Sequence, residues 1–208
     1  MSATIKRFRS LAAGPRTRWS ARDLALVAMF VGIVAALGLV PALYPFGIAV
    51  PITAQTLGVM LAGAVLGGRR GALALAVFLV LVAVGLPLLA GGRGGLAVFV
   101  GPSAGFLWSW PLAAFVVGWI TERAGAPYRM APGLLANLSG GLVVVYVIGI
   151  PVLAWLAGTS LVAAAVSSAV FVVGDVAKAV LAAVIARGVH AAYPGLLPVR
   201  TPAGDSGG

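Results

Sequence analysis

Apolar residues occupy most of this chain in long stretches that glycine and proline interrupt. A helix needs about 20 residues to cross the hydrocarbon core of a bilayer, and Gly/Pro clusters favour turns between helices. The pattern predicts six membrane spans, at residues 22–40, 53–68, 71–89, 103–121, 133–154 and 161–187. We therefore expect an all-α integral membrane protein: one six-helix domain over residues 22–190, a basic tail at residues 1–21 and a flexible tail at residues 191–208.

Spans two and three are short or punctuated by glycine. We expect the backbone near Pro51, Gly85 and Pro87 to be non-helical at membrane depth. Such backbone is tolerated only where protein or a water-filled cavity covers its polar groups. These segments therefore point to a cavity on the side of the membrane where they lie.

Basic residues follow the predicted spans asymmetrically. One side receives the N-terminal tail and Arg69, Arg70, Arg123, Arg129, Arg187 and Arg200, whereas Arg93 alone lies on the other. Because cytoplasmic connections carry the excess of Lys and Arg, both termini are predicted to be cytoplasmic. A cleaved signal peptide is the competing interpretation of the first segment, but the apolar run from Leu24 to Val40 exceeds the usual length of about 7 to 15 residues.

Composition agrees with a multi-pass protein of the cell inner membrane. Of the 208 residues, 62% are hydrophobic and 9% are charged, and the mean hydropathy is +1.12. A net charge of +10 would suggest nucleic acid as the partner of a soluble protein. Here the basic residues lie mainly at segment ends, so they indicate topology and contact with anionic lipid instead.

Two charges lie inside the sixth apolar stretch, at Asp175 and Lys178. Three residues of helix give about 300° of turn and about 4.5 Å of rise, so the two side chains share one face. Each charge costs about 2.5 to 3.5 kcal/mol at the centre of a spanning helix, and intramembrane ionisable residues mark functional sites by default. We interpret the pair as the floor of a binding site, with a structural ion pair as the alternative.

Further polar side chains lie in the predicted outer connections. Thr53, Gln55 and Thr56 enter the second span. At least one of the threonines is expected to bond back to a helix carbonyl, whereas a buried Gln55 amide needs several partners. Arg93 stands in a glycine-rich loop, where it either grips a carboxylate in bidentate fashion or points into water.

Several catalytic motifs can be tested and set aside. Gly101-Pro102-Ser103-Ala104-Gly105 matches the G-x-S-x-G pattern of serine hydrolases, but the only histidine, His190, is predicted at the opposite membrane face. Ser103 is expected to cap a helix, and His190 to be an interfacial residue. The chain contains no G-x-x-x-x-G-K-[ST] loop for ATP, and its four acids are too scattered to predict a metal site or any cofactor.

Five motifs in register resemble the BioY family, the biotin-binding substrate (S) components of energy-coupling-factor (ECF) transporters. They are Pro51-Ile52-Thr53-Ala54-Gln55-Thr56, Gly67-Gly68-Arg69-Arg70-Gly71, Gly85-Leu86-Pro87, Gly101-Pro102-Ser103-Ala104-Gly105-Phe106 and Gly174-Asp175-Val176-Ala177-Lys178. The resemblance covers about residues 20–190 and implies a six-helix bundle that captures biotin from outside. The sequence patterns alone do not choose biotin over thiamine or riboflavin; the resemblance does.

The resemblance implies roles for individual residues. It carries over directly to Asp175, Lys178 and Gln55. Together with the polar residues singled out above, the predicted substrate-binding set is Asp175, Lys178, Gln55, Thr53, Arg93, Ser103 and Tyr146. The chain departs from the family where Ser103 replaces a usual Thr and Phe106 a usual Tyr, and the outer loop of the family often carries a different polar residue from Arg93. Trp108, Phe106 or Tyr146 would form apolar walls for biotin, although Tyr146 could instead fill the core.

Small residues recur every three or four positions along the first span, at Ala21, Ala25, Ala28, Gly32 and Ala36. Such a strip lets another helix approach closely, either inside the bundle or from a partner. In the substrate components that the chain resembles, this face docks the transmembrane coupling subunit, which carries two cytoplasmic ATPase subunits. A homo-oligomer is also possible.

The sequence thus predicts high-affinity biotin capture and uptake by a transporter subunit with no catalytic activity of its own. The first alternative is a self-sufficient secondary transporter in which Asp175 and Lys178 relay protons. The second is an intramembrane serine hydrolase that uses Ser103.

Overall fold

The computed structural model describes residues 19–43 and 50–197, and the regular structure within these ranges is helical. Most of the predicted basic tail, the end of the C-terminal tail with Arg200, and residues 44–49 lie outside them. In chain order the elements are α2 (Ala21–Leu37), α3 (Gln55–Leu66), α4 (Gly68–Ala83), the 3-10 turn η2 (Leu96–Phe99), α5 (Ala104–Ala124), α6 (Met130–Leu138), the π-helical turn η3 (Ser139–Val144), α7 (Val145–Ala157), α8 (Leu161–Ser168), α9 (Val170–Ala192) and the 3-10 turn η4 (Pro194–Leu196).

Each predicted span contains a helix, but the lengths differ. By length and apolarity, α5 and the continuous segment Met130–Ala157 can each cross a membrane, and α8 with α9 forms a pair bent by 49° that passes the same criterion. The helices α2, α3 and α4 are shorter, with 17, 12 and 16 residues. The number of spans therefore stays a prediction.

Helix α4 stops at Ala83, before the end of the third predicted span, residues 71–89. Gly85 has a φ of +106°, which ends the helical conformation, and Pro87 follows with no N–H to donate. Pro51 likewise lies before the start of α3. The backbone near Pro51, Gly85 and Pro87 is thus non-helical, as the sequence predicts.

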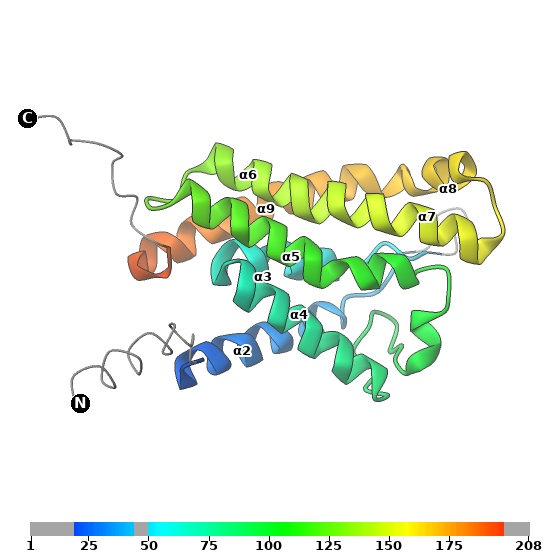
Figure 1. Cartoon of the computed structure of the whole chain (residues 1–208), viewed down its shortest axis with the longest axis horizontal. Helices are drawn as coiled ribbons and strands as arrows, with labels where there is room; N and C mark the ends of the chain where they lie inside the picture. Colours follow the sequence, from blue (N-terminus) through cyan, green and yellow to red (C-terminus); the bar gives the residue numbers. More distant parts are fainter. Residues whose placement is uncertain (1–18, 44–49, 198–208) are drawn as a thin grey trace, which may run out of the picture.

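Helix α3 lies at the centre of the bundle and packs against α2, α4, α5 and α9 (Figure 1). Every residue from Gly58 to Leu66 is buried. A side chain at Gly63 would collide with the carbonyl of Ala114 and with Val117 of α5, so the two backbones lie in close contact. Helix α3 is therefore covered on every face, which suits its continuous apolar sequence.

The π-helical turn η3 interrupts the segment Met130–Ala157 immediately before α7. Its two buried glycines lie where a side chain would clash, Gly140 against the carbonyl of Ala113 and Gly141 against Met60. A π turn changes the direction in which the following side chains point, and such turns are frequent at functional sites. Here it precedes Tyr146, which faces helix α9.

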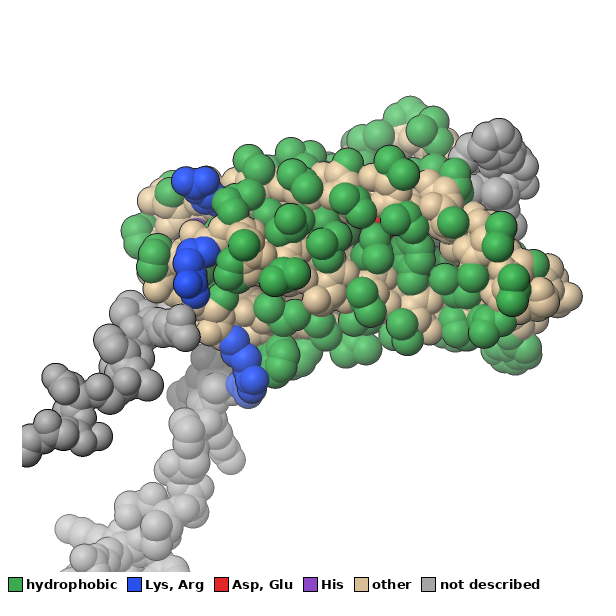
Figure 2. All heavy atoms as spheres, turned by 90° about the horizontal axis from the view of Figure 1, so that it is seen from above, with side chains coloured by type: hydrophobic (Ala, Val, Ile, Leu, Met, Phe, Trp, Pro, Cys, Tyr) green, Lys and Arg blue, Asp and Glu red, His purple; other side chains and the backbone are tan. Residues whose placement is uncertain are grey.

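The start of α2 and the end of α9 lie at one end of the molecule, and the connection from α7 to α8 lies at the other (Figure 1). Lys and Arg side chains gather at the first of these ends, while hydrophobic side chains cover the long sides (Figure 2). We call it the basic end; its arginines at helix termini are Arg22, Arg69, Arg70, Arg123, Arg129 and Arg187.

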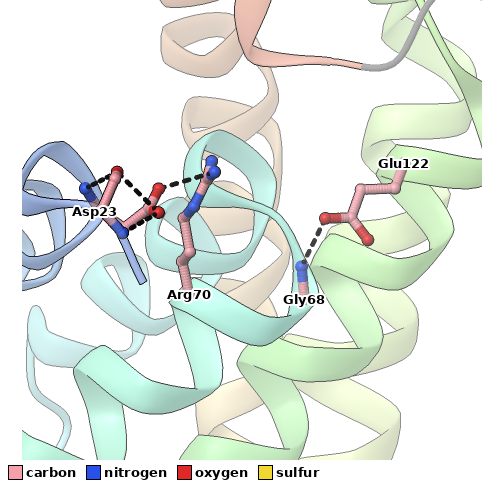
Figure 3. Close-up of polar contacts among 5 residues, drawn as sticks. Asp23, Gly68, Arg70 and Glu122 are labelled. Atoms are coloured by element: carbon pink, nitrogen blue, oxygen red, sulfur yellow. Dashed lines mark hydrogen bonds and ion pairs between the residues drawn. The ribbon is translucent and has the colours of Figure 1, made fainter. Parts of the chain in front are cut away.

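Two carboxylates tie the helices together at the basic end (Figure 3). Asp23 at the start of α2 forms an ion pair with Arg70 of α4, with 2.7 Å between Asp23 Oδ1 and Arg70 Nη2. Glu122 of α5 accepts a hydrogen bond of 3.2 Å from the backbone N–H of Gly68, the first residue of α4. A carboxylate at a helix N-terminus satisfies a free N–H and stabilises the helix dipole.

Candidate functional site

A cavity of about 60 Å³ lies on the side of the bundle away from the basic end, between the first turns of α3 and α5, helices α7 and α9, and the outer loops. All seven predicted binding residues line it: Thr53, Gln55, Arg93, Ser103, Tyr146, Asp175 and Lys178. They come from five parts of the chain, so only the tertiary structure brings them together. Their individual contacts differ from one another.

Asp175 and Lys178 form a largely buried ion pair, with 2.9 Å between Lys178 Nζ and Asp175 Oδ1. Thr56 Oγ1 closes a ring with them: it accepts a bond of 2.9 Å from Lys178 Nζ and donates one of 3.3 Å to Asp175 Oδ1. The neighbouring oxygen, Oδ2, accepts a bond of 2.8 Å from the Tyr146 hydroxyl. The pair is thus both a structural ion pair and part of a cavity wall, and two side chains from other helices fix its orientation.

The threonines differ from the prediction for this segment. Thr56 uses its hydroxyl for Asp175 and Lys178, and neither threonine bonds to a helix carbonyl in the described part of the chain. In the sequence, the charged residue nearest to Thr56 is Arg69, 13 positions away, and no local pattern could show that α9 lies beside the start of α3. Thr56 is therefore a site residue that sequence reasoning missed.

Aromatic side chains form the apolar wall of the cavity. Phe106 meets the rings of Tyr146 and Phe171 edge-on, with centroids 6.3 and 6.4 Å apart. Trp108 was predicted as a wall residue, but it is 44% exposed and does not line the cavity. Trp110, 4% exposed, takes that place, because it lies one helical turn after Phe106 on the same face of α5.

The spacing of the lining residues along α5 and α9 could have identified Trp110 and Phe171 from the sequence. On α5 the lining positions are Ser103, Phe106, Leu107 and Trp110, and on α9 they are Phe171, Asp175 and Lys178. Both sets follow the i, i+3, i+4, i+7 pattern of one helix face. Extending this face from the charged pair leads directly to Phe171.

Gln55 is 1% exposed, and its amide is occupied by backbone groups. Its Nε2 donates to the carbonyls of Val34 at 3.2 Å and Leu88 at 3.0 Å, and its Oε1 accepts from the N–H of Ala90 at 3.0 Å. The amide therefore has both donor hydrogens in use. This arrangement fits the expected need for several partners, and it makes Gln55 a clamp between α2, α3 and the outer loop rather than a free donor for a ligand.

Arg93 belongs to the glycine-rich loop that Gln55 holds. The loop contains an isolated bridge between Leu89 and Arg93, and Arg93 Nε donates to the carbonyl of Ala90 at 3.2 Å. The side chain is partly exposed and lines the cavity. Of the two predicted arrangements, the geometry is that of a guanidinium held at the edge of the cavity, with its terminal nitrogens available to an anion.

Ser103 and His190 lie in separate places. Ser103 occupies the N-cap position of α5 as predicted, but its hydroxyl makes no capping bond, and a 3-10 turn instead of a strand precedes it. His190 is buried near the basic end, with its Nε2 2.9 Å from the carbonyl of Ala64, and it stacks on Tyr128, whose pKa burial raises to about 12. The ring of His190 is enclosed by the protein, and its contacts do not include Ser103. A position of His190 at the membrane interface stays a prediction.

The small residues of α2 form an exposed strip. Ala21, Ala25, Ala28, Gly32 and Ala36 are all exposed, and a side chain added at Gly32 would meet no atom within 4 Å. The opposite face of α2, with Val27, Phe30, Val31 and Val34, is buried in the bundle. The strip therefore does not pack against other helices of this chain.

Comparisons with known proteins agree on one family. The family model described as the BioY family matches residues 11–195. The biotin transporter BioY of Rhizobium etli is 51% identical over 186 residues, covering 87% of this chain and 99% of that protein. Its counterpart in Rhodobacter capsulatus is 48% identical over 190 residues, covering 86% and 98%.

A solved structure has the same fold. The crystal structure of the S-component for biotin from an ECF-type ABC transporter matches with a TM-score of 0.80 and 30% sequence identity. The match covers 86% of this chain and 95% of the solved chain. The arrangement of helices around the cavity is thus one that a biotin-binding protein also uses.

Proposed function

Because the chain belongs to the BioY family, we infer that it is the subunit that captures biotin for an ECF-type ABC transporter. It is a multi-pass membrane protein and a transporter component rather than an enzyme, in keeping with the names of its relatives and the solved S-component. The observation that carries the proposal is the charged network of Asp175, Lys178, Thr56 and Tyr146 in the wall of a cavity that also has an aromatic wall.

The chemistry of this network suits the ureido group of biotin. A carboxylate oxygen accepts about two hydrogen bonds, so Asp175 Oδ2 can take a ureido N–H beside the Tyr146 hydroxyl. Lys178 uses two of its three N–H hydrogens on Thr56 and Asp175, which leaves one for a ligand acceptor. The Phe106 and Phe171 rings offer apolar contact to the thioether ring.

The carboxylate of biotin is assigned to Arg93. The hydrogen bond from Arg93 to the Ala90 carbonyl uses Nε, so the two terminal nitrogens can face the carboxylate as a fork. The position in a loop lets the guanidinium remain near water while the ring system lies deeper against α9. Gln55 supports this arrangement by fixing the loop, and it is assigned to positioning instead of direct contact.

Any transport energy from ATP must come through partners, because no ATP-binding loop is present in the sequence. We assign the exposed strip of α2 to docking of the transmembrane coupling subunit, which brings two cytoplasmic ATPase subunits. Small residues at a helix surface allow close backbone approach in a membrane, where van der Waals packing drives association. The basic end is assigned to the cytoplasmic side, next to anionic lipid.

A binding experiment tests the substrate. Purified protein in detergent should retain labelled biotin through gel filtration, and excess thiamine or riboflavin should not displace it. Absence of retained biotin, or displacement by either vitamin, would remove the proposal.

The buried pair of opposite charges favours one second candidate, a secondary transporter in which Asp175 and Lys178 relay protons. The two candidates differ in their energy source. Uptake of biotin that requires the ATPase subunits and withstands an uncoupler identifies the ECF-type mechanism. Uptake that an uncoupler abolishes, without any need for ATPases, identifies the proton relay.

A further inference from the structure

We propose that a groove between the α5–α6 connection and the end of α9 binds the phosphate group of an anionic phospholipid, and that Arg187 is the residue that holds it. This groove is separate from the cavity assigned to biotin, and the two share no lining residue in the described part of the chain. The inference rests on the proposed function only in placing the basic end next to anionic lipid. It goes beyond that general contact because it names one site and one cation.

The groove has a volume of about 480 Å³. Rings of Tyr128 and His190 form part of it and stack on each other, with centroids 5.1 Å apart. Among the lining residues that the structure describes, Arg187 is the one with a permanent charge, and its side chain is exposed. The remaining lining residues are apolar: Ala126, Pro127, Ala191, Pro194 and Leu197.

The carboxylates in the described ranges are engaged away from Arg187. Two of them pair with Arg70 and Lys178, and the third accepts a hydrogen bond from the backbone N–H of Gly68. The fourth acid of the sequence, Asp205, lies outside these ranges. Since Lys and Arg side chains gather at this end (Figure 2), the groove lies where positive charge favours an anion from the surroundings.

A phospholipid matches both parts of this groove. The planar guanidinium of Arg187 can bind a phosphate through two parallel hydrogen bonds. The apolar wall beside it, with Pro127 and Pro194, can cover the glycerol group and the first carbons of the acyl chains. Basic pockets between helices on the cytoplasmic side of a membrane protein are typical headgroup sites. A small free phosphate would gain little from the apolar wall.

A simpler role for Arg187 would be to stabilise the end of α9. The last carbonyls of a helix carry a partial negative charge that favours a cation, but this effect falls off within the last turn. Helix α9 ends at Ala192, and the basic residue in its last turn is His190. Arg187 lies before that turn, so the helix dipole does not account for it.

The test measures lipid binding to the full chain in detergent by native mass spectrometry. Phosphatidylglycerol is the anionic probe, and phosphatidylcholine is the zwitterionic reference. The wild type should prefer phosphatidylglycerol. Arg187→Gln should weaken phosphatidylglycerol binding about three- to tenfold, between the losses typical of exposed and of buried charged bonds, and should change phosphatidylcholine binding less.

Arg69→Gln is the matched control. Arg69 is also exposed at the basic end, but it does not line the groove. The substitution removes the same charge and should leave phosphatidylglycerol affinity unchanged. Arg187→Lys keeps the charge but loses the planar fork, so its affinity should lie between those of the wild type and Arg187→Gln.

A second variant tests the apolar part of the groove without altering any charge. Ala191 is exposed and lines the groove one helical turn after Arg187. In Ala191→Trp the indole should occupy the groove and lower phosphatidylglycerol affinity by a similar factor. Excess glycerol phosphate, which has no acyl chain, should not displace the lipid from the wild type.

Equal phosphatidylglycerol affinity in the wild type and Arg187→Gln would overturn the proposal. An equal loss in Arg187→Gln and Arg69→Gln would also overturn it, because the basic end would then attract lipid only through its overall charge. Displacement by glycerol phosphate would identify a free phosphate ester as the occupant instead of a lipid. Biotin binding should be the same in all these variants, so failure of the lipid site would leave the proposed function standing.

Discussion

The side chains of Thr56 and Tyr146 stabilise the buried pair of Asp175 and Lys178 through hydrogen bonds. Asp175 accepts from Lys178, Thr56 and Tyr146, so neither charge depends on a single partner. Removing one member of a buried pair leaves the other uncompensated, which is costly. Substitutions in this network should therefore weaken biotin binding strongly. Comparing them should show how much each side chain contributes.

Lys178→Ala and Asp175→Asn should each weaken biotin binding by at least tenfold. Loss of a charged hydrogen bond costs about 1.5 to 3 kcal/mol, which corresponds to roughly 10- to 150-fold. Isothermal titration of the purified variants measures the change, and the amount of protein extracted from the membrane checks insertion. Wild-type affinity in both variants would remove these residues from the site.

Thr56 offers a finer test of how the pair is positioned. Thr56→Val keeps the shape and loses the hydroxyl that bridges Lys178 and Asp175, so biotin affinity should fall about three- to tenfold, given about 1 kcal/mol for a typical hydrogen bond. Thr56→Ser retains the hydroxyl and should restore most of the affinity. Equal losses in the two variants would show that packing, not the bridge, is what Thr56 contributes.

Arg93 can be examined through the ligand. Converting the carboxylate of biotin to an amide should lower affinity in the wild type but not in Arg93→Ala, because the variant has no fork left for the change to affect. The effect should be modest, about 0.2 to 1 kcal/mol for a partly exposed pair. If the ratio of the affinities for biotin and biotin amide is the same in the wild type and in Arg93→Ala, Lys178 becomes the candidate that binds the carboxylate.

Helices and their connections decide where these side chains stand. Gln55 bonds the end of α2 and the loop around Ala90 to the start of α3, so the cavity wall and the loop with Arg93 form one connected unit. At the basic end, Glu122 of α5 caps α4 through Gly68. The α3–α4 connection is tight because Gly67, with a φ of +83°, leaves room for that carboxylate.

Gly67→Ala should destabilise the protein by about 2 kcal/mol or more. Its backbone conformation belongs to the region that glycine occupies almost alone, at a cost of about 1 to 3 kcal/mol for another residue. The added Cβ would also displace the Glu122 carboxylate. Thermal unfolding in detergent measures the effect. Gly188→Ala in α9 is the matched control, because nothing lies within 4 Å of its added Cβ, and it should be neutral or slightly stabilising.

The cavity and the exposed strip of small residues on α2 are separate parts of the molecule. The cavity lies away from the basic end, and the exposed strip of α2 runs along the outside of the bundle. The proposed ligand site and the proposed docking strip share no residue, so they can be disabled separately. Binding and transport should therefore respond to different substitutions.

Ala28→Leu should leave biotin binding by the isolated chain unchanged and reduce ATP-dependent uptake at least tenfold. Ala28 is exposed, so the larger side chain fits the free protein but separates it from a closely packed partner helix, and packing errors of this kind cost about 1 to 3 kcal/mol. Binding and uptake are measured with the same variant. Val173→Leu, on an exposed position of α9, adds bulk elsewhere and should preserve both. Normal uptake by Ala28→Leu would show that α2 does not dock the coupling subunit.

The sequence by itself determined the helical class and the six apolar segments, and it singled out Asp175 and Lys178 as candidate site residues. These follow from local physics: apolar periodicity marks helices, and a charge inside an apolar run is expensive wherever the chain folds. The resemblance to the family also predicted that Gln55, Ser103 and Tyr146 belong to one site, and all of them line the cavity.

Only the tertiary structure decided what those residues touch. The Thr56 hydroxyl bonds to Asp175 of α9 instead of to a carbonyl of its own helix. The Gln55 amide bonds to backbone groups. Trp110, not Trp108, lines the cavity. Each outcome depends on which helix lies opposite, and neighbours across the bundle can be far apart in the chain: Thr56 and Lys178 are separated by 122 residues. Hydrogen bonds form with whatever group is within reach, and no pattern along a single segment specifies that group.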